Sequence, residues 1–183
     1  PQSHGSYVVD ILRRVGPDFR LLPVRYPRRN MRLMEDAVEW LATHEARIVM
    51  MPLGSHAADE WEAFFAAAAR HPEMLFIISA GNNGVDLSKQ PIYPAVNQLS
   101  NALTVTSTLK DGSLADGVNF GQDVNIGLPA ENLPAIGVGN QETIMSGSSF
   151  AVPKLAGYAI CIVASTKTEK MDGAALARAV KDS

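Results

Sequence analysis

The chain has 183 residues, of which 46% are apolar, with 16 basic and 19 acidic side chains. This length and apolar content suit one globular domain with a substantial core. The near-neutral charge balance gives no reason to expect a nucleic-acid partner. The single cysteine, Cys161, excludes an intrachain disulfide, and its place in the apolar run 155–164 predicts a small core residue. That run is about ten residues long, which is too short to span a bilayer.

Helical and strand patterns alternate along the chain. After His4, apolar residues recur at helical spacing as far as Arg14, and Gly16-Pro17 ends this helix. Two further helices are predicted, at 59–70 and at 33–45. The inner face of the helix at 33–45 is predicted to carry Leu33, Ala37, Val38, Trp40 and Leu41. A polar connector at 165–170 precedes a short terminal helix that Asp172 caps. The predicted strands are short, apolar and bounded by turn residues, at 19–24, 47–51, 74–79, 102–107 and 124–128.

Strands that alternate with helices of this length pair in parallel through right-handed crossovers. The fold class is therefore α/β, a doubly wound, mostly parallel sheet with helices on both faces. Loops that carry function gather at the carboxyl ends of such strands, and Asn82 follows the strand at 74–79. Residues 150–164 are apolar on all sides, which predicts a helix buried through the centre of the domain. Ser149 lies at the start of that helix.

Three segments carry residue types that together suit nucleophilic catalysis. A serine hydroxyl is a poor nucleophile unless a base, usually histidine, takes its proton, and Ser149 and His4 fit these two roles. The oxyanion that forms then needs donors. The Asn82 amide and the Ser149 backbone N–H, at a helix N-terminus, fit that need. Gly147 would let the backbone approach the reacting carbonyl, and Ser148 could buttress the oxyanion hole.

The motifs His4-Gly5-Ser6-Tyr7-Val8, Ser79-Ala80-Gly81-Asn82-Asn83-Gly84 and Gly147-Ser148-Ser149-Phe150-Ala151-Val152-Pro153, in this order, resemble those of the subtilisin-like serine proteases, the subtilases. The resemblance covers nearly the whole chain and implies a serine endopeptidase that needs no cofactor. It also implies a substrate-binding strand ending in Pro52-Leu53-Gly54, which with Ser79-Ala80-Gly81 would form the walls of the first substrate pocket. These walls are small and uncharged.

The catalytic aspartate of the family lies on a strand upstream of the histidine. Only three residues precede His4 here, so residues 1–183 are expected to form one domain that is incomplete at both ends. Asp10 is no substitute, because on the same helix it would point to another face than His4. The resemblance therefore leaves two functions open. One is a serine endopeptidase whose aspartate comes from an upstream fragment of the same precursor. The other is a pseudoprotease or peptide-binding module that keeps the cleft without an efficient triad.

Departures from the family pattern qualify the resemblance. Pro52 stands where the edge segment should pair with a bound peptide, so it removes one backbone donor. The turn after His4 lacks the acidic or amide-rich loop that binds calcium in many relatives, and no metal is predicted. Family resemblance alone favours a secreted or periplasmic location. A basic cluster at 25–32 is either a solvated loop or a contact for substrate or pro-segment. The expected partner is a peptide or protein substrate, with no nucleic acid and no membrane span.

Overall fold

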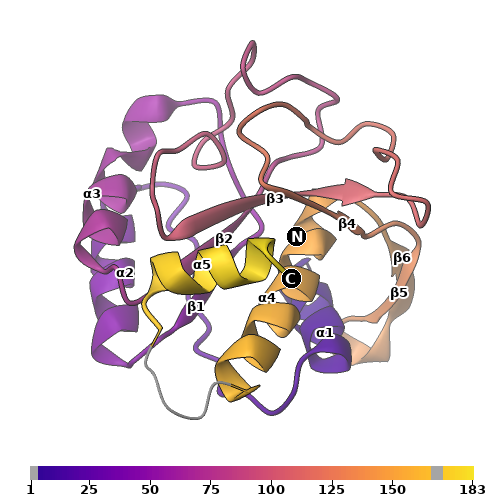
Figure 1. Ribbon diagram of the computed structural model, residues 1–183, viewed down its shortest axis with the longest axis horizontal. Coiled ribbons are helices and arrows are strands. Elements are labelled where there is room, and N and C mark those ends of the chain that lie inside the picture. Colours follow the sequence, from indigo (N-terminus) through magenta and orange to yellow (C-terminus); the bar gives the residue numbers. More distant parts are fainter. Residues whose placement is uncertain (1–3, 166–170) are drawn as a thin grey trace.

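The computed structural model describes residues 4–165 and 171–183, so most of the polar connector predicted at 165–170 lies outside the described residues. Four parallel strands form the main sheet in the order β1-β2-β3-β4 (Figure 1). All four lie within one or two residues of predicted strands. Their bounds are β1 Ile48–Met51, β2 Leu75–Ser79, β3 Ala102–Thr108 and β4 Ile126–Pro129.

The two central strands are buried on both faces. Leu75 and Ile77 of β2 point into one core, and Phe76 and Ile78 point into a second core on the opposite face. Such continuous burial is typical of parallel strands that are covered by helices on both sides. In β3 the buried Thr104 hydroxyl donates to the Ala95 carbonyl at 2.7 Å, so the polar group inside the sheet is satisfied.

Helices cover the two faces as predicted for the fold class. Helices α2 (Leu33–Thr43) and α3 (Glu62–Arg70), the latter preceded by the short helix η1 (Ala58–Trp61), pack on one face. Helices α1 (His4–Val15), α4 (Ser148–Ser165) and α5 (Gly173–Lys181) pack on the other (Figure 1). Asp172 caps α5 as predicted, because its carboxylate accepts the Ala175 N–H at 2.6 Å.

Two residues assigned to the inner face of α2 lie outside it. Leu33 is 45% exposed and Trp40 is 42% exposed, whereas Val38 and Leu41 are buried as predicted. The Trp40 ring instead packs on the His44 ring, with the ring centroids 4.1 Å apart. The apolar stripe of this helix is therefore narrower than the sequence pattern predicted, because only one face meets the core.

Helix α4 contributes the largest share of one core, but it is not buried on all sides. It has 18 residues and is long and apolar enough to span a membrane by length and composition, and half of it is buried inside the protein. The apolar run predicted at 155–164 lies inside this longer helix, and a helix buried in a protein core meets the same test of length and composition. Cys161 is exposed, which corrects its prediction as a core residue. Pro153 is the sixth residue of α4, past the first-turn N–H groups that lack intrahelical partners, so it removes the hydrogen bond that this position would donate to the Ser149 carbonyl.

Residues 19–24 were predicted to form a strand, and this prediction was wrong. The segment has no helical or strand assignment, and Leu21 and Val24 are 37% and 44% exposed. A strand requires a neighbour with which its backbone groups can pair, and none of the described residues supplies one for this segment. The structure also contains a two-stranded antiparallel sheet that was not predicted from the sequence. It is formed by β5 (Leu133–Ile136) and β6 (Glu142–Met145).

Candidate active site

Ser149 is the second residue of α4 and is half-buried. The chain reaches it through Gly147, whose φ is +109°, a conformation that side chains rarely adopt. A Cβ atom on Gly147 would lie 2.8 Å from Asn82 Oδ1. The glycine at this position therefore allows the Asn82 amide to come close to the backbone before Ser149. The sequence had suggested a different reason for the glycine, namely a close approach of the backbone to the reacting carbonyl of the substrate.

Asn82 follows β2 and is held by Ser148. Its Oδ1 atom accepts the Ser148 backbone N–H at 2.9 Å and the Ser148 hydroxyl at 3.0 Å. A backbone N–H can only donate, so this contact fixes the oxygen of the amide toward Ser148 and the NH₂ group away from it. Within the described residues no hydrogen bond uses that NH₂ group. It is therefore available to donate, and Ser148, which holds the amide, directly precedes Ser149.

The Ser148 hydroxyl is fully buried and joins three segments. It accepts the Gly81 N–H at 3.1 Å and lies 2.8 Å from the Ser79 hydroxyl. Since its own proton goes to Asn82, the Ser79 hydroxyl is the donor in that pair. Ser148 thus ties the end of β2 and the Asn82 loop to the start of α4.

Asn119 holds the loop that contains Asn82, and the sequence did not predict this contact. Its side chain is fully buried, its Oδ1 atom accepts the N–H groups of Asn83 and Val85 at 2.9 and 3.2 Å, and its NH₂ group donates to the Ala80 carbonyl at 2.8 Å. A Cβ atom on Gly81 would lie 2.6 Å from this NH₂ group, and Gly81 has a φ of +98°. Nothing in the segment Gly117-Val118-Asn119-Phe120 indicated such a contact.

A second contact that sequence reasoning missed holds Gly147. The Glu131 carboxylate accepts the Gly147 N–H at 3.1 Å and the Ser107 hydroxyl at 2.6 Å. Ser107 belongs to β3 and is fully buried. Gly147, the residue before Ser148, is therefore anchored through Glu131 to strand β3 of the main sheet.

His4 is the first described residue of α1 and is half-buried. Its ring packs on the ring of Phe150, with centroids 5.5 Å apart, which brings it to the residue next to Ser149. Burial lowers the pKa of His4, so the neutral imidazole that a general base requires is favoured. Within the described residues no carboxylate forms a hydrogen bond or ion pair with His4. Asp10 is engaged elsewhere, since it accepts from Arg14 and from the Ile136 N–H, each at 2.9 Å.

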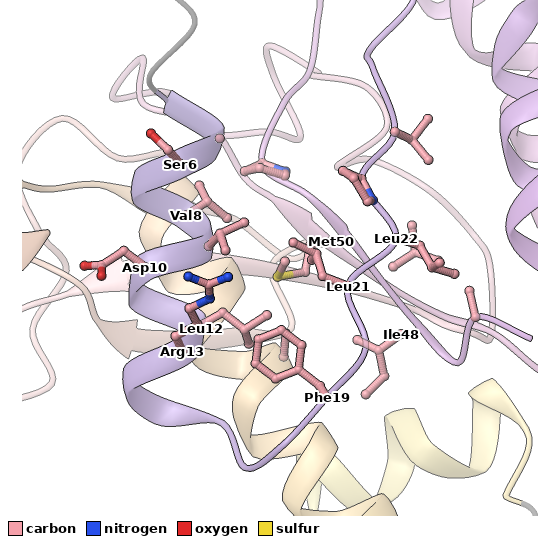
Figure 2. A pocket seen from close by; sticks show the side chains of 18 of the residues that line it. Ser6, Val8, Asp10, Leu12, Arg13, Phe19, Leu21, Leu22, Ile48 and Met50 are labelled. Carbon is pink, nitrogen blue, oxygen red and sulfur yellow. The ribbon is translucent and has the colours of Figure 1, made fainter. Parts of the chain in front are cut away.

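A cavity of about 1560 Å³ lies between α1, residues 19–28 and β1. Figure 2 shows its apolar part, where Val8 and Leu12 of α1 face Leu21, Leu22 and Phe19 across the opening, with Ile48 and Met50 of β1 behind them. His4 lines the same cavity. The free side of β1 borders it, because among the described residues β1 is the end strand of the sheet and pairs only with β2.

The predicted substrate-pocket walls lie in different surroundings. Pro52, Leu53 and Gly54 line the large cavity, whereas the segment Ser79-Ala80-Gly81 does not. Ser79 and Ala80 are buried. Next to Gly54, Ser55 and Tyr93 exchange two backbone hydrogen bonds of 2.8 Å, so the first wall is tied to the segment after the Asn82 loop.

Among residues 4–165 and 171–183, no group of three or more His, Cys, Asp and Glu side chains could hold a metal ion. The groups brought together are a serine, a half-buried histidine and an oriented carboxamide, at the start of a helix on a parallel sheet. These are the residue types that a serine hydrolase site requires.

The profile of the Subtilase family matches residues 4–183, and the chain belongs to this family. It is 27% identical over 153 residues to a thermostable alkaline protease of Halalkalibacterium halodurans, covering 81% of this chain and 41% of that protein. It is 32% identical over 129 residues to subtilisin-like protease 7 of Arthroderma otae, covering 67% of this chain and 31% of that protein. The chain thus spans less than half the length of these relatives.

Solved structures share the fold. The chain superposes on the crystal structure of a lanthipeptide protease with a TM-score of 0.81 and 18% identity, covering all of this chain and 66% of that one. It also superposes on a cold-adapted subtilisin-like serine proteinase with a TM-score of 0.72 and 20% identity, covering 95% of this chain and 65% of that one. The α/β fold predicted from the sequence is therefore confirmed as subtilisin-like.

Proposed function

We propose that this chain is part of the catalytic domain of a serine endopeptidase that cleaves peptide bonds through a covalent acyl-enzyme. The observation that carries the proposal is the Asn82 carboxamide, which Ser148, the residue before Ser149, holds with its NH₂ group free to donate. The Asn82 oxygen already serves the start of α4 by accepting the Ser148 N–H, so the NH₂ group is the part of the amide that an oxyanion could use as a donor. Membership of the Subtilase family supports the same reaction.

In the proposed reaction, the Ser149 hydroxyl attacks the scissile carbonyl carbon while His4 takes its proton. The carbonyl oxygen becomes an oxyanion, which accepts hydrogen bonds from the Asn82 NH₂ group and the Ser149 backbone N–H. The C–N bond then breaks, and His4 gives the proton to the leaving amine. Water next attacks the acyl-enzyme with His4 again as base, which releases the acid and restores Ser149.

The carboxylate behind His4 comes, in this proposal, from an upstream segment of the same precursor. Two features support it: His4 has no carboxylate partner among the described residues, and the cavity that it lines is apolar and open along the free side of β1. An extended apolar segment in this cavity would pair with β1 and cover exposed side chains such as Leu21 and Val24. Its carboxyl end would then lie near His4.

Reaction with a phosphonylating serine-hydrolase probe tests the proposal. The chain is complemented with a peptide that holds an apolar strand ending in Asp-x-Gly, and casein cleavage is measured in parallel. Ser149 should carry the label, Ser149→Ala should abolish it, and the matched variant Ser146→Ala should label normally, because the exposed Ser146 hydroxyl only accepts the Asn132 N–H. Without the segment, activity should fall by ~3 × 10⁴, the loss known for removal of the aspartate from a subtilisin.

The absence of a described carboxylate at His4 also favours a second candidate, a pseudoprotease or peptide-binding module. A complemented chain that binds peptides, leaves Ser149 unlabelled and cleaves no casein would establish this second function and overturn the first. A place of action outside the cytoplasm, secreted or periplasmic, belongs to the peptidase proposal and rests on the family alone. Peptide or protein substrates are the partners that it implies.

A further inference from the structure

Glu131 lies opposite Gly147 because of the register of the β5/β6 hairpin. Leu133 and Met145 form the pair farthest from the hairpin turn, so the same register continued by two residues brings Glu131 to Gly147. The Gly147 N–H donates to the Glu131 carboxylate at 3.1 Å, in agreement with this continuation. The hairpin therefore presents a carboxylate to the turn that leads into Ser149.

The hairpin is itself fixed to α1, the helix that begins at His4. The Ile136 N–H donates to the Asp10 carboxylate at 2.9 Å. A Cβ atom on Gly137 would lie 2.5 Å from the ring of the buried Tyr7, so the hairpin backbone packs directly on this ring. The carboxylate at the other end is thus carried by a supported backbone and not by a free loop.

One oxygen of Glu131 connects the turn to the main sheet. Its Oε1 atom accepts the hydroxyl of Ser107, on β3, at 2.6 Å as well as the Gly147 N–H. A contact of this length is typical of a hydroxyl that donates to a carboxylate. The Gly147 N–H is shared with the Ala130 carbonyl at 3.2 Å, at the long end of the usual range. Glu131 therefore adds a second and stronger acceptor for the Gly147 N–H.

Gly147 adjoins both groups proposed for the reaction. It lies against the Asn82 carboxamide, since a Cβ atom on it would be 2.8 Å from Oδ1. It also directly precedes Ser148, whose N–H holds that oxygen, and Ser149 follows. A displacement of Gly147 would therefore move the proposed oxyanion donor and the proposed nucleophile together. Misplacement of reacting groups by about 1 Å can cost about 10²-fold in rate.

We propose that Glu131 is a positioning residue for the acyl transfer at Ser149, an inference that rests on the proposed peptidase function. Through Gly147 it keeps the Asn82 NH₂ group and the Ser149 hydroxyl in their relative places. The requirement is for an acceptor oxygen and not for a negative charge, because one oxygen makes both contacts. Within residues 4–165 and 171–183, Glu131 forms no ion pair that would demand the charge. Glutamine has an amide oxygen on a side chain of the same length.

Steady-state kinetics of the enzyme complemented with the upstream segment test the proposal. Glu131→Met keeps the length of the side chain without an oxygen and should lower kcat by about tenfold to a hundredfold, the loss expected for one hydrogen bond to a charged group. KM should change little, because Glu131 acts on the reacting groups. Glu131→Gln should lose about fivefold or less, since a neutral hydrogen bond replaces a charged one. The matched control Glu142→Met removes an exposed carboxylate from β6 and should leave kcat unchanged.

A second variant reaches the same oxygen from the sheet. Ser107→Ala removes the other donor to Oε1 and should lower kcat by less than Glu131→Met does. In a Glu131→Met background it should cause no further loss, because no oxygen remains to be held. Its control on the same strand is Thr104→Val, which removes a buried hydroxyl that donates to the Ala95 carbonyl and should leave kcat unchanged. Additive losses from Ser107→Ala and Glu131→Met would overturn the inference.

Amide hydrogen exchange, followed by NMR on the chain alone, reports on the turn without any need for cleavage. The Gly147 amide should exchange roughly tenfold faster in Glu131→Met than in wild type and close to the wild-type rate in Glu131→Gln. The amides of β2 should exchange at an unchanged rate, which shows that the sheet is intact.

Wild-type kcat in Glu131→Met, or equal losses in Glu131→Met and Glu131→Gln, would overturn the inference and leave the peptidase in place. A chain that exchanges as expected at Gly147 but cleaves nothing when complemented would retain the hold of Glu131 on the turn and reject the peptidase.

Discussion

The Ser148 hydroxyl donates to Asn82 Oδ1 at 3.0 Å, and the Ser148 N–H donates to the same oxygen at 2.9 Å. One residue thus uses both its backbone and its side chain to orient a single amide. Because Ser148 directly precedes Ser149, the orientation of the amide and the position of the proposed nucleophile are set by the same turn of α4. Two consequences for activity follow from this pair, one for each partner.

Replacement of Asn82 by alanine should lower kcat, because the amide acts on charge that develops only in the transition state. The expected loss is about 10²–10³, the range known for removal of one such donor from a subtilisin. KM should change little. Steady-state kinetics of the complemented enzyme on a chromogenic peptide provide the measurement. A loss confined to KM would remove Asn82 from the oxyanion site.

The Ser148→Ala variant should lose about tenfold or less in kcat, because the backbone N–H of residue 148 still holds Asn82 after the hydrogen bond from the hydroxyl to Oδ1 is removed. Its effect should depend on Asn82. In an Asn82→Ala background, Ser148→Ala should cost little more in kcat, since no amide remains to be oriented. Additive losses in the double variant would show that Ser148 affects activity by some route other than Asn82.

Replacement of Asn119 by leucine should loosen the Asn82 loop. The N–H groups of Asn83 and Val85 would then lose their acceptor, and the Ala80 carbonyl would lose its donor. Amide hydrogen exchange should be faster at Asn83 and Val85, and kcat should fall. A matched control is Asn101→Leu, which removes a buried amide that donates to the carbonyls of Ala68, His71 and Met74, away from this loop. Unchanged exchange at Asn83 in Asn119→Leu would contradict the assignment.

His71 should make stability depend on pH. Partial burial lowers the pKa of His71, but hydrogen bonds to Glu39 and Glu73 outweigh this effect and leave the pKa above its ordinary value of 6.5. A group whose pKa is raised on folding stabilises the folded state fully below 6.5, and this contribution is lost as the pH rises through the folded pKa. Urea unfolding of wild type and His71→Gln should therefore differ most at pH values below 6.5 and converge above the raised pKa. A constant difference across the range would exclude this linkage.

Much of the fold could be predicted because the spacing of apolar residues in each segment matches the face of that segment that is buried. Strand β2 is apolar at nearly every position, and the Asp172 cap is a local hydrogen bond. Trp40 and Cys161 were assigned to the core because they are apolar, although their exposure depends on which elements pack beside them. The segment 19–24 has the pattern of a strand, but a strand forms only when a neighbour pairs with it.

The candidate site divides in the same way. Ser149, Asn82 and His4 stand in short motifs whose residue types suggest their chemistry, so sequence alone identified them as candidates. Asn119 and Glu131 contact the site across long distances in the chain, and a buried asparagine or a half-buried glutamate has no local pattern that announces its partner. Contacts between distant segments are set by tertiary packing, which a single sequence does not display.

Helix α4 extends from Ser149 to the large cavity beside β1. Ser149 lies in its first turn, while Ala156, Ile160 and Val163 further along line the large cavity beside β1. Backbone hydrogen bonds join successive turns of this helix, although Pro153 has no N–H to donate between Ser149 and Ile160. Because Ser149 and these cavity-lining residues belong to one helix, a segment that binds in the cavity is expected to affect the position of Ser149. A larger or smaller side chain at position 160 should therefore shift Ser149, which lies about three turns away along the helix.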